Sequence, residues 1–403
     1  MAARDSNEQQ AREWRTATEL VHAGTLRSEF GETSEALYLN SGFIYENAEQ
    51  AEARFNGDEE GYVYSRYSNP TVSMFEERMC RLEGAEAARG TATGMAAVAS
   101  AMLCQLAAGD HVVSGRALFG SCRYIVEELL PRFGIESTLV DGNNLQAWEA
   151  AVRPNTKLFF FETPTNPTLE LVDIEQVCAI AHGAGAVVVI DNVFATPLLQ
   201  RPMKHGADIV AYSATKHIDG HGRCLGGVVL GSAEFIEEKF QDFYKHTGPS
   251  ISPFNAWVML KGLESLPVRV ERQCASARTV ADHLAAHKGV KQVYYPGRAD
   301  HPQHDIALAQ MADGGPMVAF ELTGDKRDAF RFMNTLGIIK ISNNLGDAKS
   351  LITHPATTTH QRLEPQARAE LGISDTLLRL SLGLEDVNDL LIDIDRALKA
   401  SRL

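Results

Sequence analysis

Apolar and polar residues alternate in short blocks along the first two thirds of the chain, and these blocks predict strands and helices in turn. Apolar blocks predict strands at residues 111–115, 136–141, 157–164, 186–192, 208–216 and 226–231. Amphipathic segments predict helices at residues 121–133, 145–152 and 173–185. Strands that are apolar throughout and are separated by helices are typical of a parallel sheet with both faces covered.

The pattern changes near both ends of the chain. Residues 1–65 show little hydrophobic periodicity, and we expect an N-terminal arm. Asn69, Pro70 and Thr71 then supply helix-start chemistry before an apolar stripe. Beyond about residue 250, a long helical segment precedes mixed strands and helices, which indicates an α+β region. The predicted fold class is therefore α/β, with a mostly parallel central sheet in residues 66–262 and a smaller α+β domain in residues 263–403.

The composition narrows the choice of partners. The chain has 403 residues and a net charge of −14, which disfavours nucleic acid and anionic membranes. No apolar run is long enough to span a bilayer, and the polar N-terminus lacks the apolar segment of a signal peptide. The six cysteines are scattered without a C-x-x-C pair, as expected for free thiols in a reducing compartment. We therefore expect a cytoplasmic protein.

Polar residues gather where the predicted strands end. The residues at these ends are Glu162, Thr163, Asn166, Asp191, Asn192, Ser213, Thr215 and Lys216. Ligands of open parallel sheets bind at the carboxyl ends of strands. Each residue alone has an ordinary explanation, such as a helix cap for Asp191, turn chemistry for Asn166 or a solvated surface charge for Lys216. Their conjunction favours a binding site. The histidines of "KHIDGHGR" lack carboxylate or cysteine partners at ligand spacing, so we expect no metal there.

A glycine-containing turn adds a candidate anion site. "GTATGMAAVASAML" leads from small residues into an alanine-rich helix, and Thr93, Gly94 and Met95 lie at its start. Backbone N–H groups and the positive end of the helix dipole bind phosphate at such positions. A close-packed helix start explains the pattern about as well. The turn matches neither G-x-x-x-x-G-K-[ST] nor G-x-G-x-x-G, so ATP and dinucleotide sites lose support.

An amine, a carboxylate and a phosphate cradle together match the needs of pyridoxal 5'-phosphate. Its aldehyde bonds to a lysine, which would be Lys216, and its ring nitrogen needs a carboxylate, which would be Asp191. Its phosphate needs N–H and hydroxyl donors, which the Thr93–Met95 turn, Ser213 and Thr215 can supply. We expect Ser213 and Thr215 to occupy alternate positions of one strand and so to face the same way.

With these residues assembled, the sequence closely resembles the Cys/Met-metabolism family of pyridoxal-phosphate enzymes. The resemblance covers residues 20 to 400. The motifs that carry it are "YSRYSNPT", "TGMAA", "ETPTNP", "VVVIDNVFATP", "SATKHIDGHG", "SLITHPATTTH" and "LLRLSLGLED". Each motif alone is weak, and their number and order make the resemblance strong.

The resemblance implies a fold-type-I architecture and a homotetramer built from tight dimers. It implies that Tyr64 and Arg66 reach the phosphate of the neighbouring subunit, that Asn166 binds the cofactor and that Phe119 stacks on its ring. It also implies that Arg379 clamps the α-carboxylate of the substrate. An arginine in an otherwise apolar strand would need such an anion in any case.

Two departures from the family pattern point to one of its branches. Phe119 stands where the lyases and synthases usually have tyrosine, and Asn344, which we assign to substrate binding, stands where many relatives have serine. Both features resemble the O-succinylhomoserine sulfhydrylase branch. That branch replaces the succinate of O-succinyl-L-homoserine by hydrogen sulfide and so supplies L-homocysteine for methionine biosynthesis.

Four alternatives remain open at this stage. Three are enzymes of the same family: cystathionine γ-synthase, which uses cysteine as the nucleophile, O-acetylhomoserine sulfhydrylase and methionine γ-lyase. The fourth is a regulatory protein that binds the cofactor without catalysis. It would require a DNA-binding module, which neither the acidic composition nor the N-terminal arm supplies.

Overall fold

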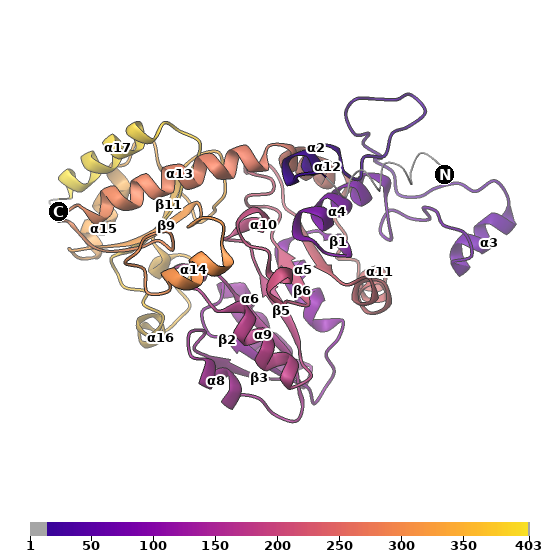
Figure 1. The fold of residues 1–403 in the computed structure, drawn as a ribbon, viewed down its shortest axis with the longest axis horizontal. Coiled ribbons are helices and arrows are strands. Elements are labelled where there is room, and N and C mark those ends of the chain that lie inside the picture. Colours follow the sequence, from indigo (N-terminus) through magenta and orange to yellow (C-terminus); the bar gives the residue numbers. More distant parts are fainter. Residues whose placement is uncertain (1–13, 402–403) are drawn as a thin grey trace. The chain divides into compact units, whose positions relative to one another are not determined.

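The computed structural model describes residues 14–401, which form two compact units (Figure 1). The first unit comprises residues 14–105, 209–215 and 223–265, and the second comprises residues 106–208, 216–222 and 266–401. Each unit is assembled from several chain segments. The sequence-based division at residues 66 and 263, which uses contiguous segments, stays a prediction.

The first unit packs helices around three strands. Its strands are β1 (Ala87–Thr91), β6 (Ile209–Tyr212) and β7 (Gly227–Gly231), and β7 pairs antiparallel with both β1 and β6. Its helices are α2 (Thr16–His22), α3 (Ala48–Asn56), α4 (Pro70–Glu83), α5 (Gly94–Leu103), a π-type turn (Phe235–Phe240), α11 (Gln241–Thr247) and α12 (Pro253–Glu264). Helix α4 begins as predicted, because the Asn69 side chain accepts a hydrogen bond from the Thr71 N–H at 2.9 Å and Pro70 occupies the first turn.

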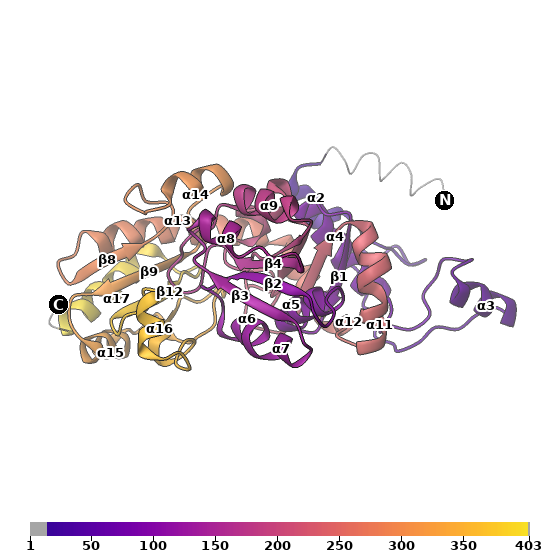
Figure 2. The same cartoon turned by 90° about the horizontal axis from the view of Figure 1, so that it is seen from below.

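The second unit contains the four parallel strands that the apolar blocks predicted. They are β2 (His111–Gly115), β3 (Glu136–Val140), β4 (Thr156–Glu162) and β5 (Val187–Asp191), and they run in the order β5-β4-β2-β3. Figure 2 shows β2, β3 and β4 side by side. The segments between them form α6 (Gly120–Tyr124), a π-type turn (Ile125–Leu129), α7 (Leu130–Arg132), α8 (Leu145–Ala150) and α9 (Ile174–Gly183). The predicted α/β class with a mostly parallel central sheet is confirmed.

The C-terminal part of the second unit forms a smaller, five-stranded sheet. Its order is β10 (Lys340–Ile341), β11 (Leu351–Thr353), β12 (Leu377–Ser381), β9 (Met317–Leu322) and β8 (Val290–Tyr294). Helices α13 (Leu266–Ala285), α15 (Lys326–Thr335) and α17 (Val387–Ala400) pack on one face of it (Figure 1). Val318 and Phe320 of β9 point into that core, whereas Met317 and Ala319 belong to a second core on the opposite face. Both faces are therefore apolar.

Several elements depart from the sequence prediction. Residues 255–287 form two helices rather than one, because α12 ends before Ser265 and α13 begins after it. Strands β1 and β11 were not predicted, nor were the short helical segments α10 (Thr196–Leu199), Pro202–His205, α14 (His304–Gln310), Pro355–Thr357 and α16 (Pro365–Glu370). Strand β6 ends at Tyr212, so the expectation that Ser213 and Thr215 alternate along a strand is wrong. No helix of residues 14–401 combines the length and apolarity needed to cross a bilayer.

The N-terminal segment is tied to its own unit by a buried ion-pair network. Glu35 is 6% exposed and forms ion pairs with Arg78, which is fully buried, and with Lys261. Arg78 also donates to the carbonyl oxygens of Val21 and Ala23 at 3.1 and 3.0 Å. Residues 21–35 of the predicted arm are therefore held against helix α4, and only part of residues 14–65 lacks regular structure.

Replacing Glu35 with alanine should destabilise the protein by about 3 kcal/mol, because it leaves the buried guanidinium of Arg78 with only the more distant carboxylate of Glu264, at 3.7 Å. Although burial acts in the opposite direction, hydrogen bonds from Lys261 and Arg78 hold the pKa of Glu35 below its usual value. The stabilisation is thus present at neutral pH and is lost as the pH falls through the folded pKa. Urea-induced unfolding of Glu35→Ala and of the exposed control Glu49→Ala measures the effect, and equal stabilities would contradict it.

Candidate active site

Lys216 lies in the turn that follows the end of β6 and carries a half-buried amine. Its Nζ donates a hydrogen bond to Asn344 Oδ1 at 2.5 Å. Burial and the positive charge of Arg379 lower the pKa of Lys216 to about 8, and Asp191 acts weakly in the opposite direction. A larger share of this amine is therefore unprotonated at neutral pH than for an exposed lysine, so it can act as a nucleophile or a base.

Gly346 brings the Asn344 segment close to Lys216. Its φ of +74° is in the left-handed region, and a Cβ there would lie 2.6 Å from the backbone nitrogen of His217 and 2.9 Å from the carbonyl carbon of Lys216. Only glycine allows the two backbones to approach this closely. This contact explains why residues 128 positions apart form a hydrogen bond.

Asp191 ends strand β5 and is half-buried. Its Oδ1 accepts a hydrogen bond from the N–H of Val193 at 3.0 Å. Burial raises the pKa of Asp191 to about 6, whereas the Val193 N–H and the charge of Lys216 act to lower it. No ion pair to Asp191 exists among the described residues, so this carboxylate is available to a cationic ligand.

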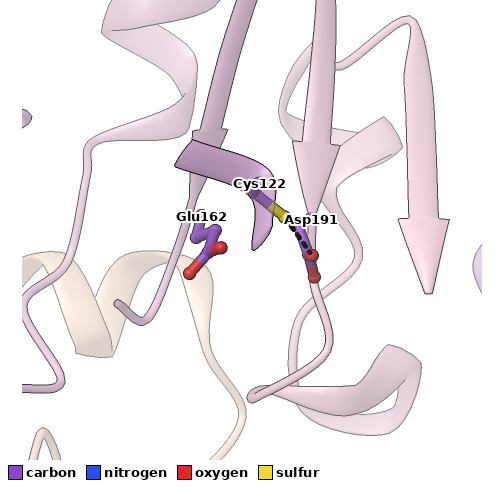
Figure 3. Close-up of side chains that lie close together, drawn as sticks. All are labelled: Cys122, Glu162 and Asp191. Atoms are coloured by element: carbon purple, nitrogen blue, oxygen red, sulfur yellow. Dashed lines mark hydrogen bonds between the residues drawn. The ribbon is translucent and has the colours of Figure 1, made fainter. Parts of the chain in front are cut away.

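Two further side chains lie against Asp191, and Figure 3 shows the cluster. Ligand atoms of Cys122, Glu162 and Asp191 all lie within 4.8 Å of one another, a spacing that could also hold a metal ion. The Cys122 thiol lies 4.0 Å from Asp191 Oδ2, and Glu162 Oε1 accepts a hydrogen bond from the N–H of Phe119 at 2.6 Å. Burial and the charge of Asp191 raise the pKa of Glu162 well above its usual value. Phe119 itself lies at the start of α6.

Arg379 is the buried cation that the apolar strand pattern predicted. It lies on β12 and is 2% exposed. Its Nη1 donates to Asn166 Oδ1 at 2.7 Å and its Nη2 donates to the carbonyl oxygen of Asn343 at 2.9 Å. Its buried Nε has no hydrogen-bond partner among residues 14–401, and burial lowers the pKa of Arg379 to about 10. A guanidinium with neutral partners and an unused donor is suited to bind a carboxylate.

The predicted phosphate turn lies in the first unit, at the start of α5. The Thr93 side chain caps this helix by accepting from the N–H of Ala96 at 3.0 Å, and the backbone N–H groups of Gly94 and Met95 occupy the first turn. A Cβ on residue 94 would lie 2.5 Å from the Cβ of Ser213, so Gly94 lets Ser213 approach the positive end of the helix. Thr215 differs from the prediction, because its hydroxyl donates to the carbonyl oxygen of Gly226 at 3.2 Å.

Tyr64 and Arg66 also lie in the first unit. The Arg66 guanidinium lies over the rings of Tyr64 and Tyr67, at 5.2 and 4.9 Å from their centroids, and Arg66 donates to the carbonyl oxygen of Lys245. In the part of the chain that the structure describes, the arginine is held by cation–π contacts and a backbone carbonyl rather than by an acidic side chain.

The second unit therefore brings together Lys216, Asp191, Phe119, Asn166, Asn344 and Arg379, and the first unit brings together Thr93, Gly94, Met95 and Ser213. Glu162, Cys122 and Gly346 also lie at this site, although the sequence pattern predicted no site role for them and marked only Glu162, as a polar residue at a strand end. The available signal for Glu162 was that the apolar runs of two strand blocks, 157–164 and 186–192, are each followed by a carboxylate, Glu162 and Asp191. Nothing in the sequence pattern indicated Cys122.

The chain is similar to several known enzymes along nearly its whole length. The O-succinylhomoserine sulfhydrylases of Mycobacterium tuberculosis and Pseudomonas aeruginosa are 53% and 48% identical to the chain, over 95% and 94% of both partners. The L-methionine gamma-lyase of Porphyromonas gingivalis is 42% identical over 95% of this chain and 96% of its own length.

A solved structure and a family profile extend the comparison. A Campylobacter jejuni protein assigned as an O-acetylhomoserine (thiol)-lyase, solved with N'-pyridoxyl-lysine-5'-monophosphate, matches with a TM-score of 0.92 and 32% identity, over 96% of this chain and 100% of that one. Residues 17–399 match the family described as Cys/Met metabolism PLP-dependent enzyme. The chain is therefore a member of the Cys/Met metabolism family of pyridoxal-phosphate-dependent enzymes.

Proposed function

We propose that this enzyme is an O-succinylhomoserine sulfhydrylase, which replaces succinate by sulfide at Cγ and yields L-homocysteine. The observation that carries the proposal is the higher identity to the two O-succinylhomoserine sulfhydrylases, at 53% and 48%, than to the methionine gamma-lyase, at 42%. The substitution of tyrosine by Phe119 supports the same choice.

The residues present fit pyridoxal phosphate. Lys216 offers a partly unprotonated amine, Asp191 offers a carboxylate without an ion pair, and the N-terminus of α5 with Ser213 offers donors at the positive end of a helix. We assign Lys216 to the aldehyde, Asp191 to the ring nitrogen and Phe119 to the ring face. Thr93, Gly94, Met95 and Ser213 are assigned to the phosphate, and so is Thr215 if its hydroxyl leaves Gly226. We also assign Asn166 to the cofactor, in addition to its contact with Arg379.

The protein's own groups then have distinct tasks. When bound, pyridoxal phosphate stabilises negative charge that develops at the substrate Cα. Arg379 binds and orients the α-carboxylate, and its unpaired Nε supports this role. The Lys216 amine removes the Cα proton, a second proton leaves Cβ as the Cγ–O bond to succinate breaks, and both carbons regain a proton after hydrosulfide has added at Cγ. Asn344, which accepts from that amine at 2.5 Å, keeps it aimed near Arg379 and so near the substrate.

The leaving group distinguishes sulfhydrylase from lyase chemistry. A thiolate, as released from methionine, is a strong base and needs a proton donor. Succinate is a weak base and leaves from Cγ as the carboxylate. Phe119 has no hydroxyl to donate, which favours an acyl substrate. A groove of about 790 Å³ in the second unit includes Phe119, Arg123, Asn343, Thr358 and Arg362 among its lining residues, and it offers room for such a substrate.

The same assignment extends to the assembly and its location. By its family membership, we propose a cytoplasmic homotetramer built from tight dimers. In it, Tyr64 and Arg66 contribute to the phosphate site of the neighbouring subunit. This role would require Arg66 to exchange its contact with the carbonyl oxygen of Lys245 for an anionic partner, to which a guanidinium binds more strongly.

A product assay tests the function directly. O-succinyl- and O-acetyl-L-homoserine are each offered sulfide and cysteine, and L-methionine is offered alone. We expect homocysteine from O-succinylhomoserine and sulfide to form with the highest kcat/KM. Cystathionine as the main product would identify a cystathionine γ-synthase. A preference for the acetyl ester would identify an O-acetylhomoserine sulfhydrylase, and ammonia release from methionine would identify a γ-lyase.

Lys216→Ala should abolish the chromophore that borohydride reduction fixes to the protein, whereas the exposed control Lys204→Ala should keep it. In the parent protein, only the unprotonated form of the Lys216 amine can bond to the cofactor aldehyde. Because the pKa of Lys216 is about 8, the rate at which the apoprotein captures the cofactor should rise with pH through that value. Covalent trapping in Lys216→Ala would show that another lysine is used.

Asp191→Asn should lower kcat by about two orders of magnitude, equivalent to about 3 kcal/mol, because a neutral amide cannot stabilise a positive charge on the ring nitrogen. Steady-state kinetics of the purified variant, with its cofactor content measured by absorbance, checks the prediction. Activity within a few-fold of the parent would remove Asp191 from this role.

A further inference from the structure

Glu162 is a buried carboxyl group that the proposed reaction leaves without a task. It is the last residue of β4 and is 5% exposed. The register of the parallel pair β4 and β5 places Glu162 opposite Asp191, the last residue of β5. Residues opposite each other on neighbouring strands project from the same face of a sheet. The sheet itself therefore places the two carboxyl groups side by side, as Figure 3 shows.

The groups that face Glu162 are few. The N–H of Phe119 donates to Oε1 at 2.6 Å, and the backbone of Asn166 also hydrogen-bonds to this carboxyl. The remaining neighbours in the cluster are the Cys122 thiol and the Asp191 carboxylate, with ligand atoms within 4.8 Å. No lysine, arginine or histidine among residues 14–401 forms an ion pair with Glu162.

Two carboxyl groups this close, with little solvent and no shared cation, cannot both be ionised without a large electrostatic penalty. The surroundings decide which group holds the proton. Asp191 receives the N–H of Val193 and the favourable charge of Lys216, which both act to lower its pKa. Glu162 has no ion pair among residues 14–401. Burial and the charge of Asp191, the two largest effects, raise its pKa well above its usual value, although hydrogen bonds from Phe119, Cys122 and Asn166 act to lower it. We therefore infer that the pair holds one proton and that Glu162 carries it.

We propose that Glu162 is a positioning residue that acts as a neutral carboxylic acid, fixing the backbone of Phe119 while leaving Asp191 as the anion of the pair. The inference rests on the proposed function, because Asp191 is there assigned to the ring nitrogen. One oxygen of Glu162 accepts from the Phe119 N–H, and the protonated oxygen supplies a hydrogen toward the cluster. One side chain thus fixes the backbone of the residue assigned to the ring face and keeps the residue assigned to the ring nitrogen ionised.

The experiment compares Glu162→Gln with Glu162→Ala in the full-length protein. Glutamine keeps a neutral acceptor for Phe119 and a donor toward the cluster, whereas alanine removes both. Glu170→Gln is the matched control, because Glu170 is a half-buried carboxyl of the segment that follows β4 and lies outside the cluster. The readouts are the Kd for pyridoxal phosphate, the thermal stability and the infrared band of a protonated carboxyl group.

We expect Glu162→Gln and the control to bind pyridoxal phosphate within about threefold of the parent, and Glu162→Ala to bind about tenfold more weakly or worse, as when a buried donor loses its acceptor. The parent should show a protonated-carboxyl band that Glu162→Gln lacks and the control keeps. The thermal stability of each variant shows whether a weaker Kd reflects the site or a loss of folding, and the infrared band tests the proposal even if Glu162→Ala does not fold.

Three outcomes would overturn the inference. The first is a Glu162→Gln variant as impaired as Glu162→Ala, which would mean that a charged Glu162 is required. The second is a folded Glu162→Ala variant that binds as well as the parent. The third is the absence of the infrared band. If instead the parent does not bond pyridoxal phosphate through Lys216, the proposed function itself fails, so the two failures are distinguishable.

Discussion

The candidate site depends on one constraint: strands β4 and β5 pair in parallel and end next to each other. Parallel register sets Glu162 opposite Asp191, so two carboxyl groups meet at one sheet edge whatever the surrounding loops do. Like charges at this separation are strongly unfavourable in a poorly hydrated place. The pair is therefore stable only with a proton or a cation, which is the requirement that the proton proposed on Glu162, or a cationic ring nitrogen at Asp191, would meet.

The second unit combines this acidic edge with two cationic groups. Lys216 and Arg379 come from distant parts of the chain, and the Asn343–Asn344 segment hydrogen-bonds to both. Their positive charges repel one another, which helps to lower the pKa of Lys216 and increases its neutral fraction. Among residues 14–401, Arg379 has amide and carbonyl hydrogen-bond partners, so its positive charge is available for the substrate carboxylate that we propose it binds. The same electrostatic field thus suits both a base and an anion-binding group.

Much of this arrangement could be predicted from sequence. Apolar blocks located β2 to β5, and the polar residues at the ends of the predicted strands 186–192 and 208–216 made Asp191 and Lys216 candidates for a binding site. The rest depended on tertiary contacts. The extent of β6 was overestimated, since Ser213 and Thr215 belong to a turn that Gly226 and helix α5 shape. Cys122 enters the cluster through the position of α6, and Glu35 is buried by residues 43 and 226 positions away. No local pattern encodes such distances.

Two contacts restrict the segment that follows the Glu35 network. Tyr38 is held to Thr71 by a 2.9 Å hydrogen bond, and Tyr64 is bridged to Gly42, so the stretch that carries the exposed side chains of Leu39, Ile44 and Phe55 is tethered at both ends. A doubly tethered loop samples far fewer shapes than a free tail of equal length. A partner surface that covers these apolar side chains therefore binds a segment whose conformations are already restricted. Less conformational entropy is then lost on association.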